Sequence, residues 1–345
     1  MSKQGNDVAA ASGRRRFSRW QIAVYTFLSL LTVVIVSVLV VLSYPDPVLN
    51  TLLKSQLTGM LQEASPGCSI HVGSVHLQTW SNCLRCDSVT LRLNKTGMKC
   101  TVGSLSVSGV HWWRVFLAEK FGPEPFTNTI VEANDLCVLL PASRYEIRCG
   151  RLRVSVPDSV VTADTLTLQP VVTDRQFFAD SPFWKTRFIM ALPQCTWSGV
   201  CWLEVLAQHH YRVRRVHVSD LHLDILVNKD KPAVVDTGMT SMPNEIVSSI
   251  QDSLQCDVME VANGILKYGE QYSVDATPAL ITFDSVNALA EGIANHPVNG
   301  EAAVIHAQAT FMKTGLMKVN MSLPLASHDF SLRYSGSSGL HFEAD

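Results

Sequence analysis

The sequence predicts a mainly β protein with one transmembrane helix near its N-terminus. Two observations support this fold class. An uncharged apolar run long enough to cross a bilayer begins about 20 residues into the chain. After residue 66 the spacing of apolar residues changes from a helical period to the period of two that is typical of strands. We therefore expect elongated antiparallel β-sheet repeats that form an open groove, with few short helices.

Composition and charge limit the class of partner. The chain has 345 residues, of which 47% are hydrophobic and 17% charged, against about 25% charged in soluble domains. Residues 1–19 carry five basic side chains and one acidic side chain, so they contribute +4 to the net charge of −2 and leave −6 for the remainder. An acidic remainder argues against nucleic acid as a partner, because phosphate contacts dominate such binding.

The membrane segment is predicted at residues 20–44. Charged residues are absent between Trp20 and Pro45, and about 20 apolar residues are enough to span a bilayer core. Trp20 and Tyr44 lie at the two ends, where amphipathic rings prefer the membrane interface. The apolar positions that define the span include Ile22, Leu28, Leu31, Val36 and Leu42.

Basic residues flank this segment on its N-terminal side. The positive-inside rule makes residues 1–19 a cytoplasmic tail and places the rest of the chain across the membrane. A cleaved signal peptide is the alternative, but its apolar region should be about 7–15 residues long and end at a small-residue cleavage site, which Leu42–Pro45 does not provide. We expect an uncleaved anchor, oriented by Arg14, Arg15, Arg16 and Arg19.

An amphipathic helix is predicted at residues 46–65. Asp46 is a good N-cap, and Pro47 suits the first helical position. Pro66 and Gly67 end the pattern. Apolar residues on one helical face are Val48, Leu49, Leu52, Leu53, Leu57, Met60 and Leu61.

Residues 66–173 are predicted to form a first β-rich region with six to eight antiparallel strands. Apolar and polar residues alternate there, with a slip at Gly73. Three segments also repeat one pattern, a glycine followed by a polar residue and then apolar–polar–apolar. The glycine suits a bulge or a tight strand entry, and the repetition indicates stacked β units. The segments begin at Val72, Val102 and Cys149.

The remaining chain is divided into a connector and a second β-rich region. Residues 174–210 are irregular and aromatic, and Trp202–Gln208 resembles a short helix, so we expect a connector there. Residues 211–345 return to strand periodicity. A helix at 243–255 is expected to interrupt them, with Pro243 in its first turn and Leu254 on its apolar face.

Cysteine spacing leaves two interpretations open. Cys83 and Cys86 form a C-x-x-C pair, and Cys68, His71, His76 and Cys100 lie nearby. A structural zinc site would need four ligands, usually from two such pairs, and only one pair exists. Small apolar core residues, or disulfides in an oxidising compartment, fit the pattern better.

A second metal-like cluster lies in the stretch His217–Asp224. On one strand, Asp220, His222 and Asp224 would share a face, but alternation with Leu221 and Leu223 favours the solvated face of a half-buried strand. Nucleophile-elbow, dinucleotide-binding and phosphate-loop sequences are absent from the chain. We therefore predict no enzyme activity, no cofactor and no metal. An envelope hydrolase that uses this cluster is the alternative.

The scarcity of charge and the many amphipathic strands favour an apolar ligand. An apolar sheet face must be buried by packing or must serve as a binding surface. Each methylene removed from water contributes about 0.8 kcal/mol, so an apolar groove can hold acyl chains without a specific motif. An ordinary two-layer core is the alternative.

The order of these segments resembles the AsmA-like proteins of Gram-negative envelopes, which are relatives of TamB. An N-terminal anchor leads into an amphipathic helix and then into short strand repeats that begin at Gly67–Leu77. The segments Asp180–Trp184, Trp197–Leu206 and Tyr211–Val216 are similar to inter-repeat segments of that family. Two further similar segments are Val261–Glu270 and Thr277–Phe283.

The resemblance implies an inner-membrane anchor, a periplasmic β-groove, and a non-enzymatic role in lipid transport or outer-membrane biogenesis. Membrane lipids are the partner it implies. The resemblance assigns no catalytic residues to this chain. The alternative is a membrane-anchored module for signalling or assembly that binds another envelope protein. Members of the family are usually much longer than this chain.

Overall fold

The computed structural model describes residues 67–78, 81–94, 96–110, 126–202, 204–205, 210–232, 253–273, 276–295, 302–324 and 331–336. The chain divides into units Met1–Leu49 and Asn50–Asp345, and all described residues belong to the second. The predicted tail, the span from Ile22 to Leu42 and the helix at 46–65 lie outside the described residues. Among the helices of the described part, none is long and apolar enough to cross a membrane.

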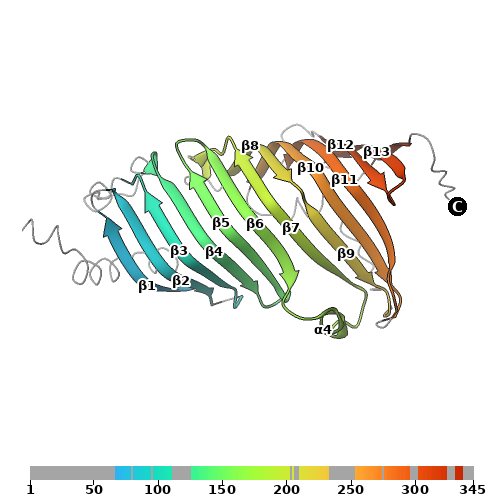
Figure 1. Cartoon of the computed structure of the whole chain (residues 1–345), viewed down its shortest axis with the longest axis horizontal. Helices are drawn as coiled ribbons and strands as arrows, with labels where there is room; N and C mark the ends of the chain where they lie inside the picture. Colours follow the sequence, from blue (N-terminus) through green and yellow to red (C-terminus); the bar gives the residue numbers. More distant parts are fainter. Residues whose placement is uncertain are drawn as a thin grey trace, which may run out of the picture. The chain divides into compact units, whose positions relative to one another are not determined.

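The described residues form a single 14-stranded sheet, which confirms a mainly β fold (Figure 1). Hydrogen-bonded neighbours follow the order β1-β2-β3-β4-β5-β6-β7-β8-β10-β11-β12-β13-β14, and β9 pairs with β7 and β10. The strands are β1 (Cys68–Gln78), β2 (Cys83–Leu93), β3 (Lys99–Ser108), β4 (Ile130–Leu140), β5 (Tyr145–Ser155), β6 (Val160–Pro170), β7 (Lys185–Ser198), β8 (His210–Ser219), β9 (His222–Asn228), β10 (Ser253–Gln271), β11 (Ala279–Ala294), β12 (Ala302–Phe311), β13 (Gly315–Pro324) and β14 (Ser331–Gly336).

Strands β1 to β6 form an antiparallel meander, at the lower end of the six to eight strands predicted between residues 68 and 172. The antiparallel prediction is wrong at one place, because β10 runs parallel to both β8 and β9. A parallel pair needs a long connection, and 24 residues of sequence, 229–252, separate β9 from β10.

The predicted connector at 174–210 is also wrong in its main part. It contains helix α4 (Asp174–Ala179) and the 14-residue strand β7, which joins the two predicted β-rich regions into one sheet. A capping box between Thr173 and Gln176 begins α4. A helical turn does begin at Trp202, where the Val205 amide donates to the Cys201 carbonyl at 3.1 Å.

The predicted helix at 243–255 is wrong at its C-terminal end. Residues 253–255 belong to β10, and Leu254 pairs with Tyr211 of β8. Long-range pairing therefore decides the conformation of Leu254, although its spacing also suits a helix. Residues 243–252 lie outside the described part.

Residues with a left-handed backbone conformation (positive φ) form a line that crosses the sheet near the middle of the strands. Six non-glycine residues on it have φ between 50° and 56°: Ser88, Asp135, Thr165, Asp220, Asn263 and Ser285. In three places a glycine lies opposite such a residue: Gly73 opposite Ser88, Gly103 opposite Asp135 and Gly150 opposite Thr165. We call this line the crease. The repeated glycines therefore mark the crease, but the strand register does not shift at them, so the structure has no β-bulge at these three positions.

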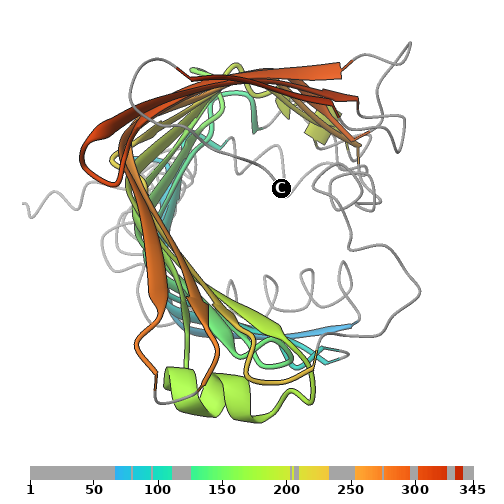
Figure 2. The same cartoon turned by 90° about the vertical axis from the view of Figure 1, so that its right-hand side faces the viewer.

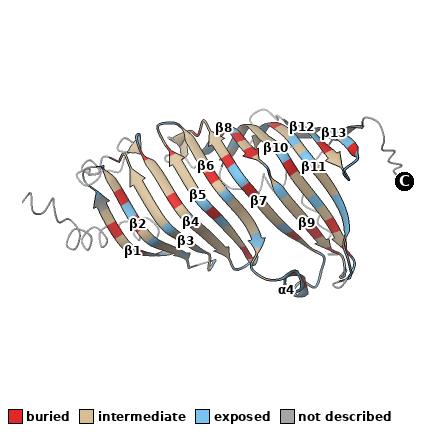
Figure 3. Cartoon of the chain, in the orientation of Figure 1, coloured by how far each residue is buried: buried red, intermediate tan, exposed pale blue. Residues whose placement is uncertain are grey.

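The strands bend, and the sheet curves into an arc (Figure 2). Side chains on opposite sides of the crease consequently come close together. Val72 and Val75 belong to one buried cluster although three positions separate them. Most residues of the sheet are intermediate in exposure, and the buried ones are spread over many strands (Figure 3).

Candidate functional site

One line of apolar side chains runs across the sheet from β1 to β13, perpendicular to the strands. Each residue on it is the registered partner of the next. With strands about 4.8 Å apart, its eleven steps cover roughly 50 Å. We call it the apolar row: Val75, Cys86, Leu105, Ala133, Leu152, Ala163, Cys195, Val218, Val261, Ala288, Ala307 and Val319.

In strands β1 to β8, a strand neighbour of each apolar-row residue is polar, and these polar residues also pair with one another across the sheet. Because successive side chains of a strand point to opposite faces, these residues lie on the other face of the sheet. We call them the polar row: Ser74, Asp87, Ser104, Asn134, Arg151, Asp164, Gln194 and Ser219. The sheet therefore has one apolar and one polar face from β1 to β8.

The apolar row lies on the inner side of the arc. Helix α4 is on the outer side (Figure 2). Its Asp174 is 3.3 Å from Nε of Arg187. By alternation, Arg187 is on the same face as Ile189 and Ala191, opposite to Leu192. Arg187 also pairs with Asp224 at 2.9 Å, so the outer face is the polar one.

Small buried residues line the inner side of the crease. Ala133, Cys149, Ala163 and Cys195 are 1–4% exposed. A bend brings inner side chains together, and small ones fit there without overpacking. The inner face is therefore closely packed at the crease and more open toward the strand ends.

The sheet has no second layer among the described elements. The substantial contacts between elements join hydrogen-bonded neighbours, apart from the contact of α4 with β7. Partly buried apolar side chains, such as Leu105 and Val107, flank the buried ones on the inner face. Among the described elements the sheet therefore has no filled two-sheet core, and the exposed apolar area of its inner face lies beside the buried residues of the crease.

Ion pairs cover the outer face. Glu132 accepts from Arg151 at 3.0 Å, and Glu146 pairs with Arg148 at 2.9 Å. Hydrogen bonds from Arg148 and Gln169 hold the pKa of Glu146 below its ordinary value. The arginine side chains of these pairs are at least half exposed, so the pairs favour solubility of the outer face and contribute little to stability.

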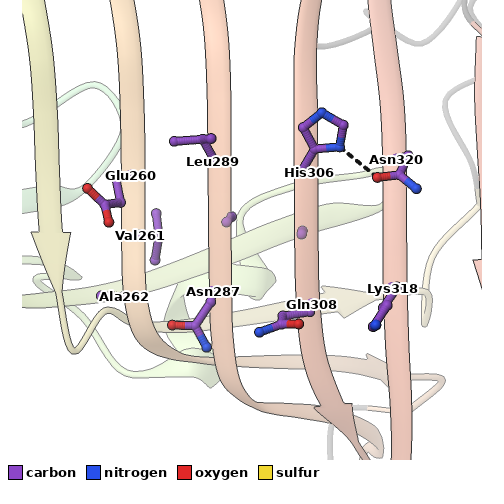
Figure 4. A pocket seen from close by; sticks show the side chains of 11 residues that line it. Glu260, Val261, Ala262, Asn287, Leu289, His306, Gln308, Lys318 and Asn320 are labelled. Carbon is purple, nitrogen blue, oxygen red and sulfur yellow. Dashed lines mark hydrogen bonds between the residues drawn. The ribbon is translucent and has the colours of Figure 1, made fainter.

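A shallow pocket of about 410 Å³ lies over β10 to β13 (Figure 4). Its side chains are mainly those of the polar face, and His306 shares a hydrogen bond with Asn320 at 2.6 Å. Lining side chains include Glu260, Asn287, Gln308 and Lys318. Sequence reasoning missed this pocket because its residues come from four separate strands and share no motif.

The metal-like stretch His217–Asp224 is divided by the crease. Asp220 lies between β8 and β9 with φ 53° and accepts from Asn263 at 2.6 Å. The Asp224 carboxylate pairs with Arg187, and His217 lies 3.3 Å from Glu260. Within the described ranges, three or more His, Cys, Asp or Glu side chains do not gather into a group that could hold a metal.

All nine cysteines are free thiols. Cys83 and Cys86 are three positions apart on β2, which places them on opposite faces of the sheet, so they do not form a chelating pair. Burial raises the pKa of the Cys86 thiol and raises that of Cys195 to about 11. Of the two interpretations that fit best, small apolar core residues describe Cys86, Cys149 and Cys195, which are buried, and the other six cysteines are half-buried free thiols.

An aromatic and charged cluster lies where β9 and β10 end. Nζ of Lys229 is 2.7 Å from the Glu270 carboxylate and 5.1 Å from the ring centre of Trp184. Tyr268 and Tyr272 also donate to Glu270, at 2.8 and 3.0 Å. These three hydrogen bonds, with that from Lys229 the largest, lower the pKa of Glu270 to about 2.

Comparisons of the chain with models of known protein families and with curated protein sequences find no match.

Proposed function

We propose that this chain is a membrane-anchored, non-enzymatic protein of the AsmA-like kind that handles lipid. In this proposal the segment 20–44 anchors it in the inner membrane, and the sheet lies in the periplasm. The inner face of the sheet holds acyl chains for lipid transport or outer-membrane biogenesis.

The observation that carries the proposal is the apolar row on the inner side of a single-layer sheet. Its length, roughly 50 Å, exceeds the ~30 Å hydrocarbon core of a bilayer. Half-buried apolar side chains in and beside the row, such as Leu105 and Val107, can hold acyl chains along this length. Each methylene that leaves water contributes about 0.8 kcal/mol, which requires apolar area and no motif.

Adjacent positions on β3 provide a matched test. Leu105 belongs to the apolar row, and Ser106 is the next residue, on the polar face; both are half-buried. A photoreactive amino acid is placed at either position of the full-length chain in cell membranes. We expect lipid adducts, identified by mass spectrometry, at position 105 and not at 106. Absence of lipid at 105, or equal yields at the two positions, would contradict the proposal.

A second candidate function is binding of another envelope protein, and the open edge of the sheet favours it. In the described part of the chain, β1 pairs only with β2, so its outer backbone groups are positioned to receive an added strand. A protein that co-purifies in equal amount with the full-length chain, with no lipid in native mass spectra, would favour this function over lipid handling.

A further inference from the structure

The exposed large hydrophobic residues of the described part gather at one end of the strands. We call this end the α4 rim: residues 170–188, 229–232, 270–281 and 311–314, apart from those outside the described part. Registered pairs such as Lys185–Asn228 and Asn228–Gln271 place these segments side by side. Eight of the eleven exposed large hydrophobic residues lie on it: Val171, Phe183, Trp184, Phe188, Tyr272, Leu280, Ile281 and Met312.

The rim residues are of the kind found at membrane interfaces. Trp184 is 43% exposed and Tyr272 is 64% exposed. Nζ of Lys229 lies 5.1 Å and 5.6 Å from the centres of these two rings. Trp and Tyr prefer the headgroup level of a bilayer, where their rings are amphipathic, and lysine extends its ammonium group toward phosphates.

The charge of the rim also favours a bilayer. The described residues of the rim include six basic residues, Arg175, Lys185, Arg187, Lys229, Lys231 and Lys313, and four acidic residues, Asp174, Asp180, Asp230 and Glu270. The net charge of these residues is therefore +2, whereas the chain after residue 19 carries −6. An acidic protein thus presents its slightly basic, aromatic end to a partner, and phospholipid headgroups complement that end.

The fold holds the rim in place. Phe177 and Phe178 of α4 are 1% and 3% exposed. Nζ of Lys231 donates to the carbonyls of Phe178, Ala179 and Ser181 after the helix. The exposed aromatic residues beside this packed helix are consequently presented on an ordered support and are not part of its core.

The rim is continuous with the inner face. Phe188, Ile225, Tyr268 and Ile281 are registered partners on four adjacent strands. By alternation they lie on the apolar face, and Phe188 and Ile281 are 41% and 39% exposed. An acyl chain that leaves a bilayer at the rim would therefore meet apolar side chains up to the apolar row.

We propose that the α4 rim docks on a lipid bilayer surface and is the place where acyl chains pass between the bilayer and the apolar row. The docking stands on the rim residues alone, and the passage of lipid rests on the proposed function.

The test compares exposed aromatic positions at the two ends of the strands. A photoreactive phenylalanine analogue replaces Phe183, Tyr272 or Tyr211 in the full-length chain, reconstituted into vesicles of phosphatidylethanolamine and phosphatidylglycerol. Tyr211, 38% exposed, lies at the opposite end and is the control. We expect several-fold more lipid adduct at 183 and 272 than at 211. Equal yields at the three positions, or protein adducts in place of lipid at the rim, would overturn the docking.

The probe at Leu105 separates the two proposals. Lipid at 105 without enrichment at the rim rejects docking and leaves lipid handling intact, while the reverse result rejects lipid handling and leaves docking intact. A variant that combines Phe183→Ser with Trp184→Ser changes only exposed side chains. It should fold normally by circular dichroism and lower the rate of lipid labelling at 105 several-fold. An unchanged rate would overturn the role of the rim in lipid passage.

Discussion

Ala163 and Asp164 are neighbours in β6, yet they belong to different surfaces of the sheet. Ala163 is 1% exposed and lies in the apolar row between Leu152 and Cys195. Asp164 lies in the polar row, between Arg151 and Gln194. The pairing register of the strands therefore determines which residues lie on each face, because a one-residue slip in that register would exchange the two rows.

The crease preserves this separation where the strands bend. Left-handed residues interrupt simple alternation, so the side chains that share a face are three positions apart across the crease. Leu192 and Cys195 of β7 show this spacing, and both belong to one buried cluster. Each strand must therefore change its pattern at the same level, or the apolar row would be broken.

The largest effect is expected from a charge placed in the apolar row. Ala163→Asp puts a carboxylate at a buried position on the inner side of the crease, without a registered cationic partner. We expect the free energy of unfolding to fall by about 3 kcal/mol or more. Pulse proteolysis of the full-length chain measures it. The control Asp164→Asn should stay within about 0.5 kcal/mol, and a similar loss in both variants would contradict the distinction between the rows.

A smaller effect is expected from the crease glycines. A Cβ on Gly150 would lie 2.1 Å from Oγ1 of Thr165, whereas one on Gly264 would meet its nearest atom at 3.4 Å. Gly150→Ala should therefore cost about 1–3 kcal/mol, and Gly264→Ala should be close to neutral. Chemical denaturation of both variants measures the difference.

The companion change Thr165→Gly tests whether the clash with Oγ1 of Thr165 causes this loss of stability. It removes the clashing hydroxyl and the strain of a β-branched residue at φ 52°. It also removes the hydrogen bond from the Gly150 amide to Oγ1 of Thr165, 3.1 Å long. In the background of Gly150→Ala it should restore most of the lost stability. If the double variant instead lost the sum of the two single losses in stability, the close contact between positions 150 and 165 would not explain why residue 150 is glycine.

The sequence predicts the alternation and the glycines of the crease well, because both are local signals. The slip at Gly73 and the repeats at Val102 and Cys149 mark the strands β1, β3 and β5. The residues opposite them were not predictable, since Asp135 and Thr165 do not ordinarily adopt a left-handed conformation within a strand.

Non-local pairing explains the errors. Strand β7 contains Pro193 and follows an aromatic loop, which hides its strand character, but it pairs with three strands of the sheet. Leu254 has helical spacing with its predecessors and belongs to a parallel pair. Neither the parallel pairing nor the rim could be found from local patterns, because both bring together residues that are far apart in the chain.

One sequence signal for the fold was available and missed. Ser-Gly-Val occurs at the end of β3 and again at the end of β7. Gly109 and Gly199 have φ of 76° and 70°, and the valines that follow, Val110 and Val200, are 0% and 8% exposed. A Cβ on Gly109 would lie 1.9 Å from the Asn128 carbonyl oxygen, so only glycine fits. The motif therefore marks two equivalent strand ends.

The smallest effect concerns the end of β10, where the apolar face becomes polar. By alternation Glu270 follows Leu266 and Tyr268 on that face, and its carboxylate is held by Lys229 and Tyr272 as well. Its pKa is lowered from 4.5 to about 2, so the folded state favours the charged form. This contribution to stability is present above pH 4.5 and is lost as the pH falls toward about 2.

Glu270→Gln should therefore lower stability at neutral pH and should unfold with a shallower pH dependence between these limits. Denaturation curves of the full-length chain in a pH series measure both effects. Glu291→Gln, at an exposed carboxylate of β11, is the control and should leave the stability at neutral pH within about 0.5 kcal/mol of that of the unchanged chain. A pH profile of Glu270→Gln that stays parallel to that of the unchanged chain would mean that Lys229 and the two tyrosines do not hold the carboxylate in solution.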